Sequence, residues 1–416
     1  MSEAAPLPMQ SWMRAPETRA VMAALEAGGG ASRFVGGCVR NAVRGEPAGD
    51  VDIATTLKPD AVTAALTAAG LKAVPTGIEH GTVTAVAGGK PFEITTLRRD
   101  VETDGRHAVV AFTDDWGADA ARRDFRLNAL YADVDGRIFD PTGEGLADAK
   151  AGRVVFVGDA ETRIREDALR ILRFFRFFAW YGRGEADAGG LAACGRLKSL
   201  IAALSAERVA QELFKLLAAE DPRPAVRLMA ATGVLAEALP EATSIGRFES
   251  LVEIETDQLF QCDAELRLAA LLPDDPEVGR AAAERLRLSN ARRDRLVAAL
   301  GTEPPIVSWM SPREARRSVY RLGVAAFCDR VLLAWARSER HAAANQWRAL
   351  IPMAQSWPRP TLPLTGAEVM AAGVPEGPLV GEVMREVESW WVDQDFIDDK
   401  LSIVERLKAV AQGMVY

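Results

Sequence analysis

The chain has 416 residues, of which 49% are hydrophobic and 26% are charged, and this composition is typical of a soluble globular protein. A chain of this length exceeds one compact core, so two to four domains are expected. The net charge of −8 argues against a protein that coats nucleic acid. It does not exclude an enzyme that acts on nucleic acid, because binding depends on local basic patches.

The four cysteines are scattered without a Cys-x-x-Cys pair, which excludes a disulfide framework and a zinc site of the usual spacing. Only three histidines are present, so a mechanism built on a histidine cluster is not expected. No long apolar run predicts a membrane span, and the first residues lack the basic and then apolar pattern of a signal peptide. A cytoplasmic protein is therefore expected.

The first 150 residues mix helix and strand patterns. In chain order the expected elements are a helix at 17–27, a strand at 33–35, a helix at 39–44, a strand at 51–55, a helix at 58–70, strands at 82–86 and 92–97, and short strands at 127–133 and 137–139. The pair within 82–97 is a predicted hairpin, because Gly88-Gly89-Lys90-Pro91 separates its strands. Residues 98–116 are polar with little periodicity, which predicts a mobile loop.

After about residue 152 the strand patterns nearly vanish. Helical periodicity covers 162–180, 206–219, 224–231 and most of the remainder, with a glycine-rich break at 182–190 and a proline-rich linker at 356–363. The predicted fold class is therefore α+β, with a small mixed-sheet head followed by an all-helical neck, body and tail.

The most informative feature is a glycine pair followed by two aspartates, Gly36 and Gly37 before Asp50 and Asp52. Residues two apart on a strand point to the same side, so both carboxylates can face a pair of Mg²⁺ ions. The glycines allow a backbone turn to approach a bulky anion, which Arg40 is placed to cap. This combination suits nucleotidyl transfer, whereas an isolated Asp-x-Asp is usually a solvated strand end.

A third carboxylate, Glu93, lies on the second strand of the predicted hairpin. A neighbouring strand can bring it beside Asp50 and Asp52. Two aspartates that bridge metal ions, with one acid near the attacking hydroxyl, are a sufficient set for two-metal chemistry. The predicted catalytic residues are therefore Asp50, Asp52 and Glu93, with the two aspartates as metal ligands.

Two further clusters carry arginines and carboxylates. In the first, Arg122, Asp124 and Asn128 are candidates to bind the triphosphate and the ribose, because guanidinium groups suit phosphate oxygens. The alternative is an exposed helix start. In the second, the predicted helix at 162–180 places Asp167 and Arg170 three apart on one face.

Cytosine and adenine both present an amino donor next to a ring-nitrogen acceptor, and guanine and uracil present the reverse order. An acceptor (Asp167) beside a donor (Arg170) therefore pairs with C and A without a template, and Arg173 follows one turn later. An ordinary intrahelical salt bridge is the alternative.

In this order the motifs resemble those of class II CCA-adding enzymes (tRNA nucleotidyltransferases), in the polymerase β-like nucleotidyltransferase superfamily. The resemblance rests on Gly36-Gly37-Cys38-Val39-Arg40-Asn41, Asp50-Val51-Asp52, Glu93-Ile94-Thr95-Thr96-Leu97-Arg98, Asp104-Gly105-Arg106, Arg122 to Asn128, Glu166-Asp167-x-x-Arg170 and Glu207-Arg208-x-x-x-Glu212-Leu213. It covers about half of the chain closely. Bacterial poly(A) polymerases share the head motifs, but here the stretch after Leu379 carries more acids than bases.

The resemblance implies addition of CCA to tRNA 3′ ends from CTP and ATP, with Mg²⁺ as the cofactor and no protein partner. It implies a nucleotidyltransferase head at 1–150, a base-selecting neck at 151–222, and a body at 223–355 and a tail at 356–416 that bind tRNA. Four arginines on one face of a predicted helix are candidate phosphate contacts in the body: Arg313, Arg316, Arg317 and Arg321. A solvated basic face is the alternative, and members of the family that add only CC or only A are not excluded.

Two positions depart from the family pattern. Asn41 stands where the motif usually ends in Asp, and Arg126 stands where threonine is common. If position 41 orients Arg40 by hydrogen bonding, asparagine can serve, but a required negative charge would be missing. Arg126 is expected to add a positive charge near the nucleotide site.

Overall fold

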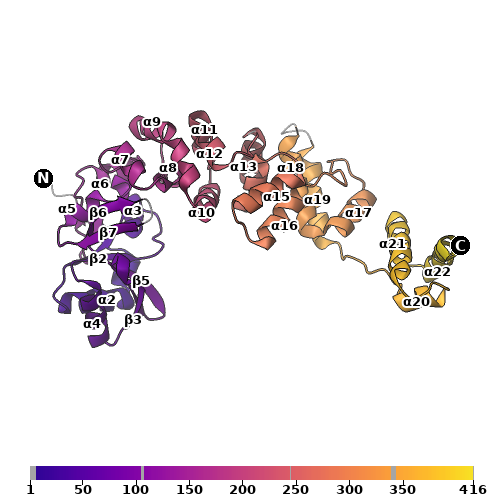
Figure 1. Ribbon diagram of the computed structural model, residues 1–416, viewed down its shortest axis with the longest axis horizontal. Helices are drawn as coiled ribbons and strands as arrows, with labels where there is room; N and C mark the ends of the chain where they lie inside the picture. Colours follow the sequence, from indigo (N-terminus) through magenta and orange to yellow (C-terminus); the bar gives the residue numbers. More distant parts are fainter. Residues whose placement is uncertain (1–5, 105–106, 244, 339–342, 416) are drawn as a thin grey trace. The chain divides into compact units, whose positions relative to one another are not determined.

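The computed structural model describes residues 6–104, 107–243, 245–338 and 343–415 (Figure 1). The chain divides into two compact units, Met1–Pro240 and Glu241–Tyr416, and the first unit contains every predicted catalytic and nucleotide-binding residue. No helix among the described residues is long and apolar enough to cross a membrane.

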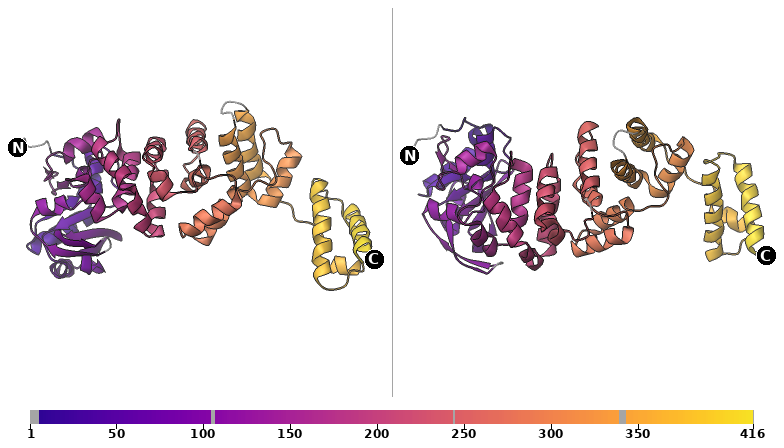
Figure 2. Two further views of the ribbon diagram at one scale, coloured as in Figure 1. Left: turned by 45° about the horizontal axis from the view of Figure 1, so that its top comes forward. Right: turned by 90° about the horizontal axis from the view of Figure 1, so that it is seen from above.

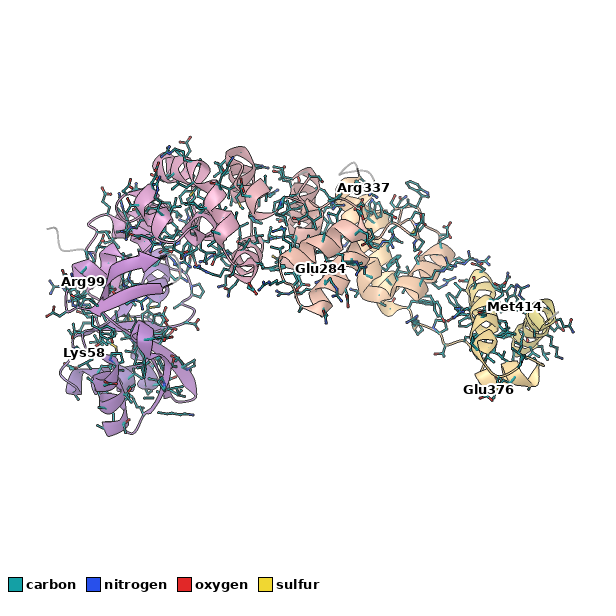
Figure 3. The ribbon with its side chains drawn as sticks, viewed as in Figure 1. Lys58, Arg99, Glu284, Arg337, Glu376 and Met414 are labelled. Carbon is teal, nitrogen blue, oxygen red and sulfur yellow. The ribbon has the colours of Figure 1, made fainter. Side chains whose placement is uncertain are left out.

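A seven-stranded sheet organises the first part of unit 1. Its order is β3 (Lys72–Gly77), β4 (Thr82–Ala87), β5 (Lys90–Thr96), β2 (Asp52–Thr55), β1 (Ser32–Val35), β8 (Tyr131–Ala132) and β9 (Ile138–Phe139). Strands β2 and β5 pair in parallel, and the other neighbouring pairs are antiparallel. Helix α2 (Pro16–Ala27) packs on β4 and β1, and helix α4 (Pro59–Ala68) packs on β3, β4 and β5. Lys58, labelled in Figure 3, precedes α4 as its N-cap. Both helices begin with proline, which favours the first helical position.

The predicted mobile loop at 98–116 is wrong. Strands β6 (Arg98–Asp104) and β7 (His107–Phe112) form a two-stranded antiparallel hairpin instead, with Arg99 of β6 labelled in Figure 3. Strand pairing uses backbone groups, so the polar sequence of β6 does not prevent it. Gly105 and Arg106 of the expected flexible-loop motif lie outside the described residues.

The remaining helices of unit 1 lie before, between and after the strands. They are α1 (Ser11–Arg14), α3 (Gly37–Arg44), α5 (Trp116–Ala121), α6 (Gly145–Ala151), α7 (Ala160–Glu166), α8 (Leu169–Tyr181), α9 (Ala188–Arg196), α10 (Ala206–Leu217), α11 (Arg223–Thr232) and α12 (Val234–Ala238), with short 3₁₀ turns at Ile78–His80, Arg126–Asn128 and Lys198–Ala203. The single helix predicted at 162–180 is wrong, because Asp167 has extended backbone angles and separates α7 from α8.

An aromatic core joins the sheet region to α8. Phe125 lies 4.9 Å from Phe156 and 5.2 Å from Phe177 between ring centroids, and Phe156 stacks on Phe174 at 5.6 Å. All four side chains are buried. Each such aromatic pair adds about 0.5–1.5 kcal/mol beyond the burial of its area. The residues that follow Ala121 are thereby held against α8.

Unit 2 is helical. It comprises α13 (Gly246–Asp257), α14 (Ala264–Leu271), α15 (Pro276–Arg285), α16 (Asn290–Ala299), α17 (Pro312–Leu322), α18 (Val324–Arg337), α19 (Ala344–Ser356), α20 (Gly366–Ala371), α21 (Pro378–Asp393) and α22 (Lys400–Val415). Figure 2 shows α21 and α22 side by side, and Val383, Val387, Trp391, Ile403 and Leu407 are buried in their common core. The predicted α+β class, with a mixed sheet followed by helices, is confirmed.

Candidate active site

Three carboxylates meet at one edge of the parallel strand pair. Asp52 begins β2 and is the register partner of Glu93 in β5, so the expected approach of these two residues is confirmed. Asp50 precedes the strand and is exposed, so the two aspartates do not share one strand as the sequence suggested. The reason is local, because β1, the partner of β2, ends at Val35 and leaves Asp50 without a pairing residue.

The carboxylates repel one another. Burial, and to a smaller extent the neighbouring charges of Glu93 and Asp50, raise the pKa of Asp52 to about 6, and the charge of Arg123 opposes the shift. Within the described residues no group of three or more His, Cys, Asp or Glu side chains is already arranged to hold a metal ion. The donor set nevertheless fits Mg²⁺, because these hard oxygen ligands carry a mutual repulsion that a divalent cation would relieve.

A glycine turn lies between β1 and α3. Gly36 has a φ of 72° and a ψ of −122°, in the region that favours glycine, and its N–H donates to the carbonyl of Leu130 at 3.1 Å. Helix α3 starts at Gly37 without a side-chain cap. Its first backbone N–H groups therefore lack a side-chain acceptor, and a helix end of this kind favours an anion.

Arg40 of α3 is buried, and all three of its guanidinium nitrogens donate hydrogen bonds inside the protein. Its Nε and Nη2 donate to Asn41 Oδ1 at 3.0 and 2.8 Å, Nη1 donates to Asn128 Oδ1 at 2.6 Å, and Nη2 donates to the Tyr181 hydroxyl at 2.7 Å. Burial lowers the pKa of Arg40. Asn41 thus orients Arg40 by hydrogen bonding, and the capping of an anion by Arg40 stays a prediction.

Arg122 and Arg123 share one buried carboxylate that the sequence analysis missed. Asp119 of α5 accepts from Arg122 Nη2 at 2.7 Å, from Arg123 Nη2 at 3.0 Å and from the Tyr131 hydroxyl at 2.7 Å. Burial alone would raise the pKa of Asp119, but Arg123 and Arg122 lower it to about 2. Arg122 and Arg123 carry two positive charges and Asp119 carries one negative charge, so one positive charge is in excess. Arg123 also borders the space above Gly36.

Asp124 and Asn128 form a second hydrogen-bonded group. Asn128 Nδ2 donates to Asp124 Oδ1 at 3.2 Å, and Arg173 of α8 donates to Asp124 Oδ2 through Nε at 2.8 Å and through Nη2. Burial raises the pKa of Asp124, but the charge and hydrogen bond of Arg173, together with hydrogen bonds from Asn128 and the Phe125 N–H, bring it below its ordinary value. The structure therefore brings together Asp124, Asn128 and Arg173, three of the residues predicted to bind the nucleotide.

Asp167 and Arg170 have different partners and do not form the intrahelical salt bridge that was the alternative. Asp167 Oδ2 accepts from Arg208 of α10 at 2.8 Å, whereas Arg170 Nη1 donates to Glu166 at 2.6 Å and Nη2 donates to the carbonyl of Arg122 at 3.0 Å. Asp167 lies between two helices, so the expected common helical face does not exist. Both residues still flank the start of α8.

Arg126 does not point toward the carboxylates of Asp50, Asp52 and Glu93. Its guanidinium pairs with Glu144 and lies 3.8 Å from Asp148, which is buried. Its charge is therefore balanced by acidic side chains next to α6, and the expected addition of positive charge at the nucleotide site is not supported by these contacts.

The predicted RNA contacts on α17 already bind acidic and carbonyl groups within unit 2. Arg316 pairs with Asp395, Arg317 Nε donates to the carbonyl of Val392 at 3.1 Å, and Arg321 lies 3.7 Å from Asp393. Arg313 also donates to the carbonyl of Asp393. These contacts fix the end of α21 on α17, and a role in RNA binding stays a prediction.

Four residues near the site were missed: Asp119, Tyr131, Tyr181 and Arg208. Asp119 carries a usable signal, since it stands three and four residues before Arg122 and Arg123 in a helical turn. Tyr181 has no such signal, because its contact with Arg40 joins residues that are 141 positions apart.

Comparisons with known proteins identify related sequences. Residues 32–155 match the Poly A polymerase head domain, and residues 190–245 match the probable RNA and SrmB-binding site of polymerase A. The CCA tRNA nucleotidyltransferase 1, mitochondrial, of Mus musculus is 30% identical over 403 residues, covering 90% of this chain and 86% of its own. The CCA-adding enzyme of Limosilactobacillus fermentum is 29% identical over 93% of this chain and 95% of its own.

Solved structures extend the comparison to the fold. The CCA-adding enzyme of Bacillus stearothermophilus in complex with CTP has a TM-score of 0.78 and 27% identity, and covers 98% of this chain and 99% of its own. The Thermotoga maritima CCA-adding enzyme complexed with tRNA shares the fold, with a TM-score of 0.69 at 18% identity, covering 98% of this chain and 99% of its own. With carboxylates, glycine turn and arginine clusters placed as described, this chain belongs to the CCA tRNA nucleotidyltransferase family.

Proposed function

We propose that this protein adds CCA to the 3′ ends of tRNA from CTP and ATP, releases pyrophosphate and uses no nucleic-acid template. The observation that carries the proposal is the meeting of Asp52 and Glu93 beside an uncapped glycine turn, within a chain of this family. Relatives and solved structures that are named for CCA addition, or for complexes with CTP, ATP and tRNA, support it.

Asp50 and Asp52 would hold Mg²⁺, which when bound activates an attacking hydroxyl and neutralises the triphosphate. Glu93 is exposed beside Asp52 and would accept the proton of the tRNA 3′-hydroxyl. The turn at Gly36 and Gly37 offers backbone N–H groups to the triphosphate, whose α-phosphorus the 3′-oxygen attacks.

The nucleotide would be held by charge that the protein has already arranged. Asp119 fixes Arg122 and Arg123 through charge-assisted hydrogen bonds and neutralises only one of them. Because the other positive charge is uncompensated there, the site favours an anion. Asp124 and Asn128 would bind the sugar.

Asp167 and Arg170 would read the base from the start of α8. Asp167 presents an acceptor that Arg208 holds at 2.8 Å, and Arg170 presents donors that are anchored on Glu166. An acceptor and a donor that are fixed separately can pair with the amino donor and the ring-nitrogen acceptor that C and A both present. Their different anchors make the pair rigid without requiring that they share a helical face.

We also propose the four functional regions expected from the sequence: a catalytic head at 1–150, a base-selecting neck at 151–222, a tRNA-binding body at 223–355 and a tRNA-binding tail at 356–416. Arg313, Arg316, Arg317 and Arg321 would reach RNA phosphates only in competition with their present partners. Cytoplasmic location stays a prediction, and three relatives are named as mitochondrial proteins.

The test uses three labelled tRNA transcripts that end before CCA, after C and after CC, with each nucleotide offered alone and together. Ordered growth that stops at CCA supports the proposal. A long A tail would instead indicate a poly(A) polymerase, and partial products would indicate an enzyme that adds only CC or only A. An Asp50→Ala control should lose turnover and keep tRNA binding.

A further inference from the structure

Two hydrogen-bonded contacts fix the first half of α8 on the head. Arg170 Nη2 donates to the carbonyl of Arg122 at 3.0 Å, and Arg173 Nε donates to Asp124 at 2.8 Å. Both donors are charged, and both acceptors belong to the segment that the aromatic core presses against the helix. Charge-assisted hydrogen bonds of this kind are stronger than neutral ones, so they set the position of the helix start.

A third contact fixes the other end of α8. Tyr181, the last residue of the helix, accepts a hydrogen bond from Arg40 Nη2 at 2.7 Å, and the Arg40 guanidinium lies 3.8 Å from the centroid of its ring. Asn41 fixes Arg40 in turn, because its Nδ2 donates to the carbonyl of Pro47 at 2.8 Å and so directs its Oδ1 at the guanidinium. Arg40 is only 5% exposed.

The same guanidinium also connects to the middle of α8. Arg40 Nη1 donates to Asn128 Oδ1, Asn128 Nδ2 donates to Asp124, and Asp124 accepts from Arg173. Each amide has one donor and one acceptor in use, so the direction of every bond in this relay is determined. This relay of hydrogen bonds runs from Arg40 in α3, the helix that follows the glycine turn, to Arg173, which lies one turn beyond Arg170.

From these contacts we infer that Arg40 is a positioning residue for α8 and not a ligand of the triphosphate, and that Asn41 is the residue that orients it. To reach a bound anion, Arg40 would have to give up four hydrogen bonds from a buried position. Left where it is, it determines where Arg170 lies relative to the head.

The consequence for the reaction is selectivity. Hydrogen bonds to a base weaken steeply when donor and acceptor leave their preferred geometry, so a small shift of α8 affects the correct base more than the triphosphate. This inference rests on the proposed function. It predicts that changes at Arg40 alter the choice between bases, whereas a triphosphate ligand would affect all nucleotides alike.

The experiment measures kcat/KM for CTP and for UTP on a tRNA transcript that ends before CCA. The variants are Tyr181→Phe, which deletes the hydroxyl acceptor, and Arg40→Lys, which keeps the positive charge but cannot make the forked contacts. We expect the preference for CTP over UTP to fall by about three- to tenfold in each, the size of one lost hydrogen bond. Tyr131→Phe is the matched control, because it removes a hydroxyl bound to Asp119 and touches none of the relay.

An equal rise in KM for both nucleotides in Arg40→Lys, with the preference unchanged in both variants, would overturn the inference and return Arg40 to the triphosphate. If Arg40→Lys does not fold, which a thermal melt detects, Tyr181→Phe decides alone. A wild-type protein without any preference for CTP and ATP would overturn the proposed function itself. That failure is visible before any variant is made.

Discussion

Asp52 and Glu93 are opposite each other in the parallel pair of β2 and β5, and the burial of Asp52 together with this neighbour raises the pKa of Asp52 to about 6. A carboxyl group whose pKa is higher in the folded state than its ordinary 3.8 lowers stability whenever it is ionised. The cost is fully present above the folded pKa and disappears as the pH falls from about 6 toward 4.

The first prediction follows from the upward direction of this pKa shift. Asp52→Asn should raise the free energy of unfolding of the metal-free protein at pH 7.5 by about 1–3 kcal/mol and abolish nucleotide addition. The gain should shrink as the pH falls through the folded pKa and vanish near pH 4. Urea unfolding of both proteins across this range measures it, and a gain that is independent of pH would contradict the raised pKa.

Asp119 provides a second prediction. Asp119→Asn should destabilise the fold by about 3–5 kcal/mol, because two arginines lose the charge of their common buried partner. KM should rise for CTP and ATP together if Arg122 and Arg123 bind the phosphates of both, as proposed. Tyr131→Phe removes one hydrogen bond to the same carboxylate and no charge, so its effect on stability should be only about 1 kcal/mol. Equal effects of the two variants would show that the charge of Asp119 is unimportant.

Asp167 and Arg170, which are proposed to read the base, provide the third prediction. Replacing Asp167 and Arg170 together by residues that present the inverse order of donor and acceptor should relax or redirect base choice toward G and U. Single-nucleotide incorporation assays on the transcript that ends before CCA detect the change. Arg208→Ala should loosen Asp167 without altering the donor order, and so lower kcat/KM for CTP without favouring a different base. Unchanged selectivity in the double variant would remove both residues from this role.

The arginines of α17 provide the fourth prediction. If Arg316 contacts RNA phosphates, Arg316→Ala should weaken tRNA binding and reduce the magnitude of the salt slope by about one unit. Asp395→Ala, the matched change on the other side of the ion pair, should free the guanidinium and strengthen binding. Filter binding at several salt concentrations measures both. If neither variant changes the affinity while both lower the melting temperature, the pair serves the fold of unit 2 alone.

The sequence was informative where chemistry depends on local spacing. The hairpin of β4 and β5 and the glycine turn both follow from patterns a few residues long. Pairing partners distant in sequence were not predictable, so the contacts of Arg40 with Tyr181 and of Arg173 with Asp124 were missed. The break at Asp167 was missed because helical periodicity continues through it.

The aromatic core beneath α8 has a consequence for recombination between relatives. The matched head domain ends at residue 155, but Phe125 packs on Phe156 and Phe177, which lie beyond that end. A chimera that crosses over at 155 would therefore join ring surfaces from two parents that never evolved against each other. The smallest segment that can be exchanged as a unit extends through Tyr181, so that both sides of the core and the Arg40 contact travel together.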